Sequence, residues 1–271
     1  MTTRPIQHDH AIVTGGSSGI GFATALALRA RGMWVTIIAR DQGRLDEAKQ
    51  RLSSAPSEGG IAAFSADVGD EAELRRAIEA SIGEFGPPSW AVSSAGIVVP
   101  AKFLDTSIAD HLAQLRTNYL GSLHLAHIVA PILCEGGHLV FVASAAAILG
   151  IYGYSAYGAS KFAVRGLAEV LRVELAARKI AVTLVLPPDT DTPMLAAEER
   201  IRPEATRRIS KGAGLWKPDD VARLLVAGAS AGRFIVAPGW QTKVLAALHS
   251  LVSPAFRIYQ QRLADTVNRG S

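Results

Sequence analysis

A tyrosine and a lysine four residues apart form the pair with the clearest chemical potential in this sequence. Tyr157 and Lys161 lie in the stretch YGYSAYGASK, 152–161, and residues i and i+4 of a helix share one face. A neighbouring ammonium lowers the pKa of a phenol from about 10, and the phenol then donates a proton near neutral pH. Tyr152 and Tyr154 have no cation at this step. Tyr157 is therefore predicted as a proton donor, and the other two tyrosines as walls of a substrate cleft.

Ser144 is the second candidate, because it ends an apolar run, HLVFVAS at 138–144. Ligands of open α/β sheets bind beyond the carboxyl ends of the strands. A hydroxyl at such an end can donate a hydrogen bond to a carbonyl oxygen and to the oxyanion that develops on it. A carbonyl that accepts hydride also needs a proton, so Ser144 and Tyr157 together indicate the reduction of a ketone.

A glycine-rich loop, TGGSSGIG at 14–21, follows the first apolar run and precedes a helical pattern. Its glycines have the spacing G-x-x-x-G-x-G, which departs from the common G-x-G-x-x-G. Glycines permit a tight turn and a close approach to a pyrophosphate, which the helix N-terminus also attracts. The residues predicted to contact a dinucleotide here are Gly15, Ser17, Ser18, Gly19, Ile20 and Gly21.

The end of the second strand-like run, WVTIIA at 34–39, predicts which dinucleotide is bound. The run ends in Ala39-Arg40, without the carboxylate that would bind the ribose 2′-hydroxyl of NAD. Arg40 can pair with a 2′-phosphate, which favours NADP(H). Asp41 is expected to cap the next helix, although it can also reach the ribose. Asp67 and Val68, after the third run, are placed to meet the adenine.

The elements that must position these groups alternate along the chain. Strand-like apolar runs at 11–14, 34–39, 61–66, 91–95, 138–144 and 181–186 are separated by helical patterns, and 233–238 adds a last candidate. Such alternation predicts βαβ units and strands covered on both faces. We expect an α/β fold with one domain over residues 1–240, a Rossmann-type doubly wound parallel sheet with helices on both faces.

The composition of the chain indicates the cellular compartment in which the protein works. The chain of 271 residues has one cysteine, Cys134, and carries no signal-peptide core at its start, which favours a reducing, cytoplasmic setting. No stretch has the roughly 18 uninterrupted apolar residues that a spanning helix needs. The seven histidines are scattered, so no metal site is predicted.

The C-terminal region is basic, with twelve lysines and arginines against five acidic residues over 199–271. The tail 241–271 mixes apolar and basic residues, and Pro254 is expected to break it into two short helices. Such a segment can lie on an anionic membrane surface, or bury its apolar side against the domain or a second subunit. Nucleic-acid binding is not favoured, since no binding motif accompanies the charge.

Taken in order, these motifs resemble the short-chain dehydrogenase/reductase family over roughly residues 8–237. The resemblance rests on TGGSSGIG, Asp67, the Ser93-Ser94-Ala95-Gly96 segment, Asn118, Ser144 and Tyr157-x-x-x-Lys161. It implies that Ala95 and Gly96 contact the cofactor, and that Tyr157 and Lys161 also hold its ribose. It further implies that Asn118 kinks its helix and holds a water that connects Lys161 to solvent. Ser93 stands where the family usually has asparagine, and Pro187-Pro188-Asp189 where it often has Pro-Gly.

The second departure is informative, because PPDTDTPM at 187–194 resembles the 3-ketodihydrosphingosine reductases, as do 160–175, 201–210 and 217–222. This resemblance implies NADPH-dependent reduction of 3-ketosphinganine to sphinganine, a long-chain lipid ketone as substrate, and a homo-oligomer. Residues 193–216 are expected to form a substrate lid. Pro187, Thr190 and Thr192 would contact the nicotinamide, and Met194, Leu195, Leu149 and Ile151 would line the cleft.

Two alternatives stay open. The same chemistry can serve another ketone or alcohol, such as a 3-oxoacyl group, a steroid or a xenobiotic. The fold can also serve a non-catalytic dinucleotide-binding protein, although such a protein needs no proton relay.

Overall fold

The computed structural model of the protein describes residues 9–210 and 214–269. Seven parallel strands form one sheet in the order β3-β2-β1-β4-β5-β6-β7. Their bounds are β1 His10–Thr14, β2 Trp34–Ala39, β3 Ile61–Ser65, β4 Trp90–Ser93, β5 His138–Val142, β6 Ala181–Val185 and β7 Ile235–Val236. The predicted doubly wound parallel sheet is confirmed, and each predicted run holds a strand.

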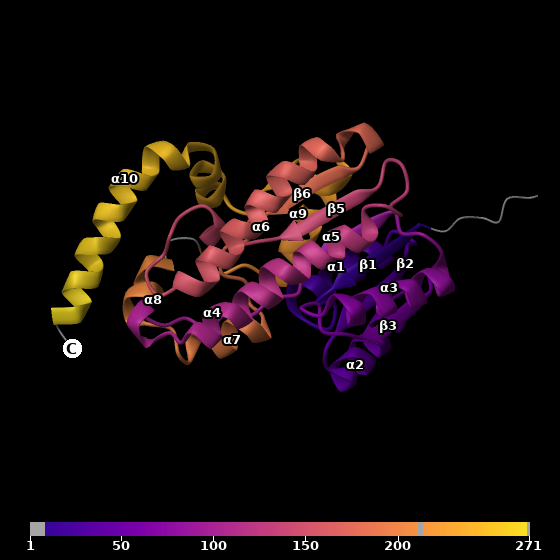
Figure 1. Ribbon diagram of the computed structural model, residues 1–271, viewed down its shortest axis with the longest axis horizontal. Helices are drawn as coiled ribbons and strands as arrows, with labels where there is room; N and C mark the ends of the chain where they lie inside the picture. Colours follow the sequence, from indigo (N-terminus) through magenta and orange to yellow (C-terminus); the bar gives the residue numbers. More distant parts are fainter. Residues whose placement is uncertain (1–8, 211–213, 270–271) are drawn as a thin grey trace, which may run out of the picture.

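Helices cover both faces of this sheet (Figure 1). One face packs on α3 (Glu71–Phe85), α5 (Gly121–Val129) and α6 (Ser155–Glu174). The other packs on α1 (Gly19–Arg29), α2 (Gln42–Ser53) and α9 (Pro218–Ser230). Neighbouring strand residues alternate between the two cores: Ile12 faces the first, and Ala11 and Val13 face the second. Because both faces are covered, the strands are mostly apolar, with a few buried polar residues such as His10 and Thr36.

The helix between β4 and β5 is interrupted. Its first part is α4 (Ile108–Leu115), followed by a π-helical turn at Arg116–Leu120 and then by α5. π-turns inside α-helices are frequent at functional sites. The kink expected at Asn118 is present as this turn.

The segment predicted as a lid, 193–216, forms two short helices, α7 (Pro193–Glu199) and α8 (Glu204–Ser210). Residues 211–213 of the predicted lid lie outside the described residues. An isolated β-bridge pairs Trp216, the last residue of this segment, with Thr190, which lies just before it.

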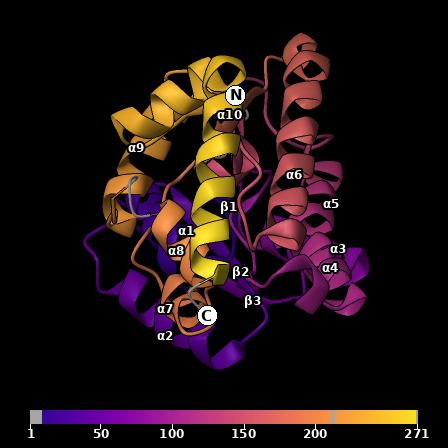
Figure 2. The same cartoon turned by 90° about the vertical axis from the view of Figure 1, so that its left-hand side faces the viewer.

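The C-terminal helix, α10 (Trp240–Arg269), contains a bend. Figures 1 and 2 show a short arm followed by a longer arm that passes α8. The backbone leaves helical geometry at Leu248 (φ −117°, ψ 22°), whereas Pro254 lies inside the helix. The helix is thus divided in two, but at Leu248 and not at the predicted Pro254. Within the described residues, no helix has the length and apolar character needed to cross a membrane.

Candidate active site

One cavity of about 460 Å³ lies at the carboxyl ends of the strands. It is lined by the glycine loop after β1 and by the segments that follow β2, β3, β4, β5 and β6. The strand order reverses between β1 and β4, and ligands of such sheets bind at this switch point. Most of the predicted site residues line this one cavity, whereas Asp67, Asn118 and Tyr152 do not.

The glycine loop fits a pyrophosphate. Gly15 has a positive φ of 68°, and a Cβ there would lie 2.7 Å from the Ala95 backbone nitrogen. Ser18 is the N-cap of α1 but makes no side-chain hydrogen bond to it. The first N–H groups of α1 thus remain available for an anion, as helix N-termini that bind phosphates require. All six predicted loop residues line the cavity.

Two arginines line the cavity beyond β2. Arg40 is one, as predicted, and Arg44 in the first turn of α2 is the other. The Asp41 carboxylate accepts a hydrogen bond from the Arg44 backbone N–H at 3.0 Å, so Asp41 caps α2 as expected. Arg44 was missed from the sequence, because its proximity to Arg40 follows from the position of the helix start.

The two residues predicted after β3, Asp67 and Val68, differ in their position relative to the cavity. Val68 lines the cavity together with Ala66. The Asp67 carboxylate instead accepts a hydrogen bond from the Gly69 backbone N–H at 2.9 Å and lies 3.6 Å from Arg116 Nη2. Asp67 is not among the residues that line the cavity, so its contact with an adenine stays a prediction.

Ser144, Tyr157 and Lys161 lie together where β5 ends and α6 begins, and all three line the cavity. Burial raises the pKa of Tyr157, while a hydrogen bond with Ser144 acts in the opposite direction. Lys161 Nζ donates to the Val142 carbonyl at 3.0 Å and lies 5.8 Å from the Tyr157 ring centroid. Burial lowers the pKa of Lys161 to about 8. Tyr157 and Lys161 can thus hold and exchange a proton beside the Ser144 hydroxyl, and carbonyl reduction requires both of these functions.

Asn118 is fully buried in the π-helical turn. Its Oδ1 accepts from Ile97 N–H at 2.8 Å, and its Nδ2 donates to the Ile97 carbonyl and to Ser160 Oγ. A Cβ on Gly96 would lie 3.2 Å from Asn118 Oδ1 and 3.5 Å from Lys161 Nζ. Asn118 thus fixes the segment after β4 against the residues next to Lys161.

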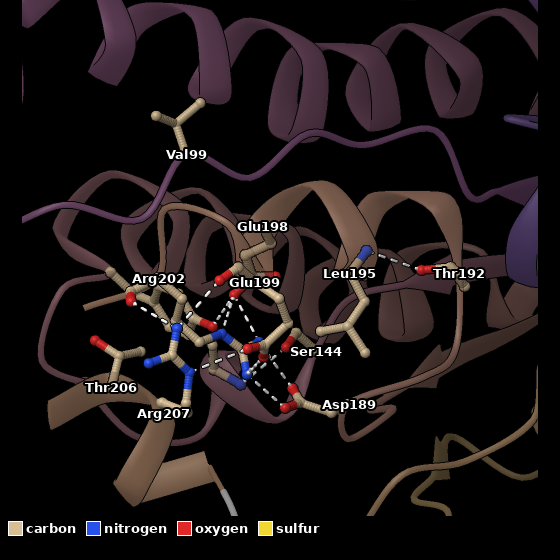
Figure 3. A network of polar contacts seen from close by, with 12 residues as sticks. Val99, Ser144, Asp189, Thr192, Leu195, Glu198, Glu199, Arg202, Thr206 and Arg207 are labelled. Atoms are coloured by element: carbon tan, nitrogen blue, oxygen red, sulfur yellow. Dashed lines mark hydrogen bonds and ion pairs between the residues drawn. The ribbon is translucent and has the colours of Figure 1, made fainter. Parts of the chain in front are cut away.

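An ion network centred on the buried Arg202 borders the cavity (Figure 3). The Tyr154 hydroxyl donates to Glu198 Oε1, and Arg202 pairs with Glu198 at 2.6 Å and with Asp189 at 2.7 Å. Arg202 also lies 2.7 Å from Glu199. Tyr154, Asp189 and Glu198 line the cavity. Burial raises the pKa of Tyr154, and the Glu198 carboxylate raises it further. Tyr154 is therefore a wall residue, as predicted.

Tyr152 is not among the cavity-lining residues, unlike its neighbour Ile151. Its backbone N–H donates to Gln260 Oε1 at 3.3 Å, and its carbonyl accepts from Thr206 Oγ1 at 2.7 Å. The prediction that its side chain forms a wall is thus corrected: Gly153 has a positive φ of 80°, and this turn binds the segment to α8 and α10 through the backbone of Tyr152.

The segment after β6 behaves as predicted in position. Pro187, Thr190, Thr192 and Met194 line the cavity, as do Leu149, Ile151 and Leu195. Two of the hydroxyls already have protein partners. Thr190 Oγ1 donates to the Pro188 carbonyl at 2.9 Å, and Thr192 Oγ1 caps α7 by accepting from Leu195 N–H at 3.2 Å.

Comparison with known proteins decides the family. A model of the short chain dehydrogenase family matches residues 9–202. The chain belongs to this family. The 3-ketodihydrosphingosine reductase of Bos taurus is 36% identical over 256 residues, which are 93% of this chain and 77% of the relative. The 3-dehydrosphinganine reductase TSC10B of Arabidopsis thaliana is 37% identical over 239 residues, covering 86% of this chain and 71% of the relative.

Solved short-chain dehydrogenases share the fold. A family member from Burkholderia phymatum in complex with NAD has a TM-score of 0.78 at 26% identity, covering 91% of this chain and 94% of its own. One from Burkholderia cenocepacia in complex with NADP has a TM-score of 0.76 at 28% identity, covering 87% and 99%. Short-chain dehydrogenases are oxidoreductases that use a nicotinamide dinucleotide, and the glycine loop described above fits one.

In this short-chain dehydrogenase the unusual Ser93 is well accommodated. Its hydroxyl lies 2.9 Å from Ser122 Oγ, which in turn donates to the Asn118 carbonyl at 2.7 Å. The hydrogen bonds that tie β4 to the π-helical turn are therefore made through two serines.

Among the described residues, no group of three or more His, Cys, Asp and Glu side chains is arranged to hold a metal ion. The residues that the sequence reasoning missed are Arg44, Asp189, Glu198 and Arg202. The i,i+4 spacing of Glu198 and Arg202 was a visible signal of their ion pair.

Proposed function

We propose that the protein reduces 3-ketosphinganine to sphinganine with NADPH. The observation that carries the proposal is the extent of similarity to enzymes named for this ketone, which spans more than nine tenths of the chain for the bovine relative and includes the segments around the cavity. The residues in and around the cavity support this proposal.

The reaction needs one proton at the ketone oxygen, and Tyr157 Oη holds it. Ser144 Oγ donates a hydrogen bond to the same oxygen and steadies the charge that develops there. Lys161 stabilises the Tyr157 anion that remains after the proton has left. Asn118, beside Lys161, sustains the relay that returns a proton from solvent. When bound, NADPH supplies the hydride.

The cavity suits an amphipathic cation. A long-chain 2-amino-3-ketone carries an ammonium next to the reacting carbonyl and an alkyl chain beyond it. Asp189 and Glu198 bring carboxylates to the lining, and Leu149, Ile151 and Met194 bring apolar side chains. The Asp189 and Glu198 carboxylates share Arg202 as their cation, while Glu199 also pairs with Arg207, and their oxygens are the acceptors that a substrate ammonium would meet in the cavity.

We infer NADP(H) rather than NAD(H) from the two arginines beyond β2. Arg40 and Arg44 both line the cavity, and guanidinium groups bind phosphates as charge-assisted, forked donors. The Asp41 carboxylate is occupied by the α2 cap, which leaves the arginines as the groups that meet the ribose substituent. Pro187, Thr190 and Thr192 are assigned to the nicotinamide side.

The test is a spectrophotometric screen of NADPH oxidation. It compares 3-ketosphinganine with a neutral 3-ketone of equal chain length, a 3-oxoacyl thioester, a steroid ketone and a small xenobiotic ketone. We expect 3-ketosphinganine to give the highest kcat/KM. Preference for another ketone would replace the substrate and keep the chemistry, and a lack of turnover with the whole panel would favour the dinucleotide-binding alternative.

We further propose that α10 touches a membrane surface and that the enzyme works at the cytoplasmic face of that membrane. The side of α10 turned away from the domain exposes Leu248, Leu251, Ile258 and Tyr259, which recur at helical spacing. Arg257 and Arg262 stand beside them. An apolar stripe with basic neighbours is typical of interfacial helices.

Liposome co-sedimentation of the full chain tests this. Leu251→Asp with Ile258→Asp should abolish binding to anionic vesicles. Ser250→Asp with Gln261→Glu adds the same charge on exposed positions outside the stripe and should weaken binding much less. Equal sedimentation of all three proteins would discard the membrane proposal.

We also propose a homo-oligomer built on α4 and α6, which pack against each other. Both expose large apolar side chains on their outer faces, and exposed apolar patches of this kind mark interfaces. The residues are Ile108 and Leu112 on α4, and Phe162, Val170 and Val173 on α6. Light scattering of Val170→Asp with Val173→Asp should give a smaller species than the wild-type chain; an unchanged mass would exclude α6 from the interface.

A further inference from the structure

The catalytic cavity has an apolar wall that comes from three separate segments. Leu149 and Ile151 precede α6, Ile209 belongs to α8, and Leu245 and Phe256 belong to α10. We call these five residues the apolar wall. None of them carries a charge, and two come from the C-terminal helix, which lies beyond the residues matched by the family model.

The bend of α10 allows one helix to supply two of these residues. Leu245 lies in the short arm and Phe256 in the long arm, on either side of the non-helical Leu248. Figure 2 shows the long arm running across α8, and the two helices are in contact. On the long arm, Phe256 faces inward with the buried Ser253, whereas Leu251 is 77% exposed and Ile258 is 56% exposed.

Gln260 attaches the long arm to the catalytic segment. Its Nε2 donates to the Gly150 carbonyl at 3.1 Å, and its Oε1 accepts from the Tyr152 backbone N–H at 3.3 Å. These two bonds join α10 to the turn directly before α6, which carries Tyr157. Gln260 thus fixes the distance between Phe256 and the reacting group.

We propose that α10 is the alkyl-chain part of the substrate site, that Phe256 sets the longest chain that is bound in full, and that Gln260 is the positioning residue that holds Phe256 there. The proposal rests on the proposed function in so far as the substrate is a chain-bearing ketone. A chain attached to a ketone at Tyr157 meets the apolar wall, since both belong to one cavity. Each buried CH₂ contributes about 0.8 kcal/mol, roughly fourfold in kcat/KM.

The experiment measures kcat/KM on the full chain for two ketone series, 2-amino-3-ketones and neutral 3-ketones, with alkyl groups from hexyl to dodecyl. Calorimetry with the NADPH-loaded enzyme measures Kd for the matching 1-alkylamines, independently of turnover. Phe256→Ala and Phe256→Trp alter the wall, and Phe256→Leu is the conservative variant. Gln261→Ala, at an exposed position of the same arm that lies outside both the cavity and the membrane stripe, is the control. Gln260→Leu keeps the size of the side chain and removes both hydrogen bonds.

We expect the wild-type values to rise roughly fourfold per CH₂ up to a plateau. Phe256→Trp should move the plateau to shorter chains. Phe256→Ala should move the plateau to longer chains, because the smaller side chain leaves room for further CH₂ groups, and should leave hexyl substrates unchanged. Gln260→Leu should flatten the chain-length dependence with little change in short-chain kcat, and Gln261→Ala should change nothing.

Wild-type profiles in all Phe256 variants, or an equal loss for short and long chains, would overturn the proposal. Unchanged melting temperature and NADPH affinity in Phe256→Leu separate such a loss from misfolding. Turnover of the neutral series alone would refute the amino-ketone substrate while still testing α10. If no ketone is reduced, the alkylamine Kd values decide: chain-length dependence that ignores Phe256 overturns the proposal.

Discussion

The rings of Tyr154 and Tyr157 pack edge to face with their centroids 5.3 Å apart, yet their hydroxyls have different partners. Tyr154 donates to the Glu198 carboxylate, which opposes loss of its proton. Burial and the Glu198 carboxylate raise the pKa of Tyr157, but its hydrogen bond with Ser144 favours the anion, and Lys161 Nζ lies 5.8 Å from its ring centroid. Two adjacent phenols in one cavity are therefore prepared for opposite tasks, one to keep its proton and one to exchange it.

This difference predicts the behaviour of two matched variants. Tyr157→Phe should lower kcat for ketone reduction by roughly 10²- to 10⁴-fold, because general acid catalysis is worth that much. Its Kd for NADPH, measured by fluorescence titration, should remain measurable. Tyr154→Phe should retain most of kcat. Near-normal turnover of purified Tyr157→Phe would show that the proton comes from elsewhere.

Cofactor preference gives a second prediction. Arg40→Ala should raise KM for NADPH by roughly 10- to 100-fold and leave KM for NADH nearly unchanged, since hydrogen bonds to charged groups contribute about 1.5–3 kcal/mol. Arg44→Ala should act in the same direction, with Arg51→Ala, on the same helix, as the control. Equal changes for both cofactors would remove Arg40 from the 2′-phosphate site.

The parts of the site that the sequence predicted are local. The spacing of Tyr157 and Lys161, the glycine loop and the strand end at Ser144 each lie within a few residues, and periodicity placed them on elements whose carboxyl ends meet.

The ion network was not predicted, because Tyr154, Asp189 and Arg202 come from three segments whose contact depends on how the lid folds. Gln260 and Gly150 are 110 positions apart, and no local pattern signals their contact. The bend in α10 was misplaced because Pro254 is a local signal, whereas no proline or glycine marks Leu248, where the backbone leaves helical geometry.

The ion network around Arg202 leads to a prediction about the stability of the fold. Arg202 is 5% exposed and pairs with Glu198, Glu199 and Asp189. Arg202→Met leaves Glu198 and Asp189 without their cation, whereas Glu199 keeps Arg207, and should lower the free energy of unfolding by about 3–5 kcal/mol. Arg208→Met breaks only the exposed pair with Glu204 and should cost less than about 1 kcal/mol. Urea unfolding measures both, and equal losses would contradict the account.

The buried Lys161 predicts a pH dependence. Its pKa is lowered to about 8 by burial, so its charge is present below this pH and lost as the pH rises through it. Ketone reduction needs this charge, hence kcat/KM should fall above about pH 8. In the folding equilibrium the sign is opposite: stability rises from about pH 8 towards the unfolded pKa near 10.5, because the unfolded state then binds the extra proton.

A Lys161→Arg variant checks the assignment. Its guanidinium stays charged throughout this range, so any residual activity should lose the falling limb near pH 8. A limb that persists in this variant at the same pH would belong to another group.

His10 predicts a loss of stability in acid. It is fully buried, with Nδ1 2.9 Å from the Gly86 carbonyl and Nε2 2.9 Å from Thr36 Oγ1. Because a carbonyl only accepts, Nδ1 carries the proton and Nε2 accepts from the threonine. Burial lowers the pKa of His10 from 6.5 to about 4, so its contribution is complete above 6.5 and is lost as the pH falls towards 4.

Between about pH 7.5 and about pH 4.5 this loss should amount to roughly 2–3 kcal/mol of unfolding free energy. His10→Gln keeps a donor and an acceptor but does not titrate. It should be less stable than the wild-type chain at the higher pH and lose that much less on acidification, as measured by urea unfolding at both values. The carboxylates titrate in both proteins and cancel in the difference. If both proteins lose the same amount, the buried imidazole is not the group that acid attacks first.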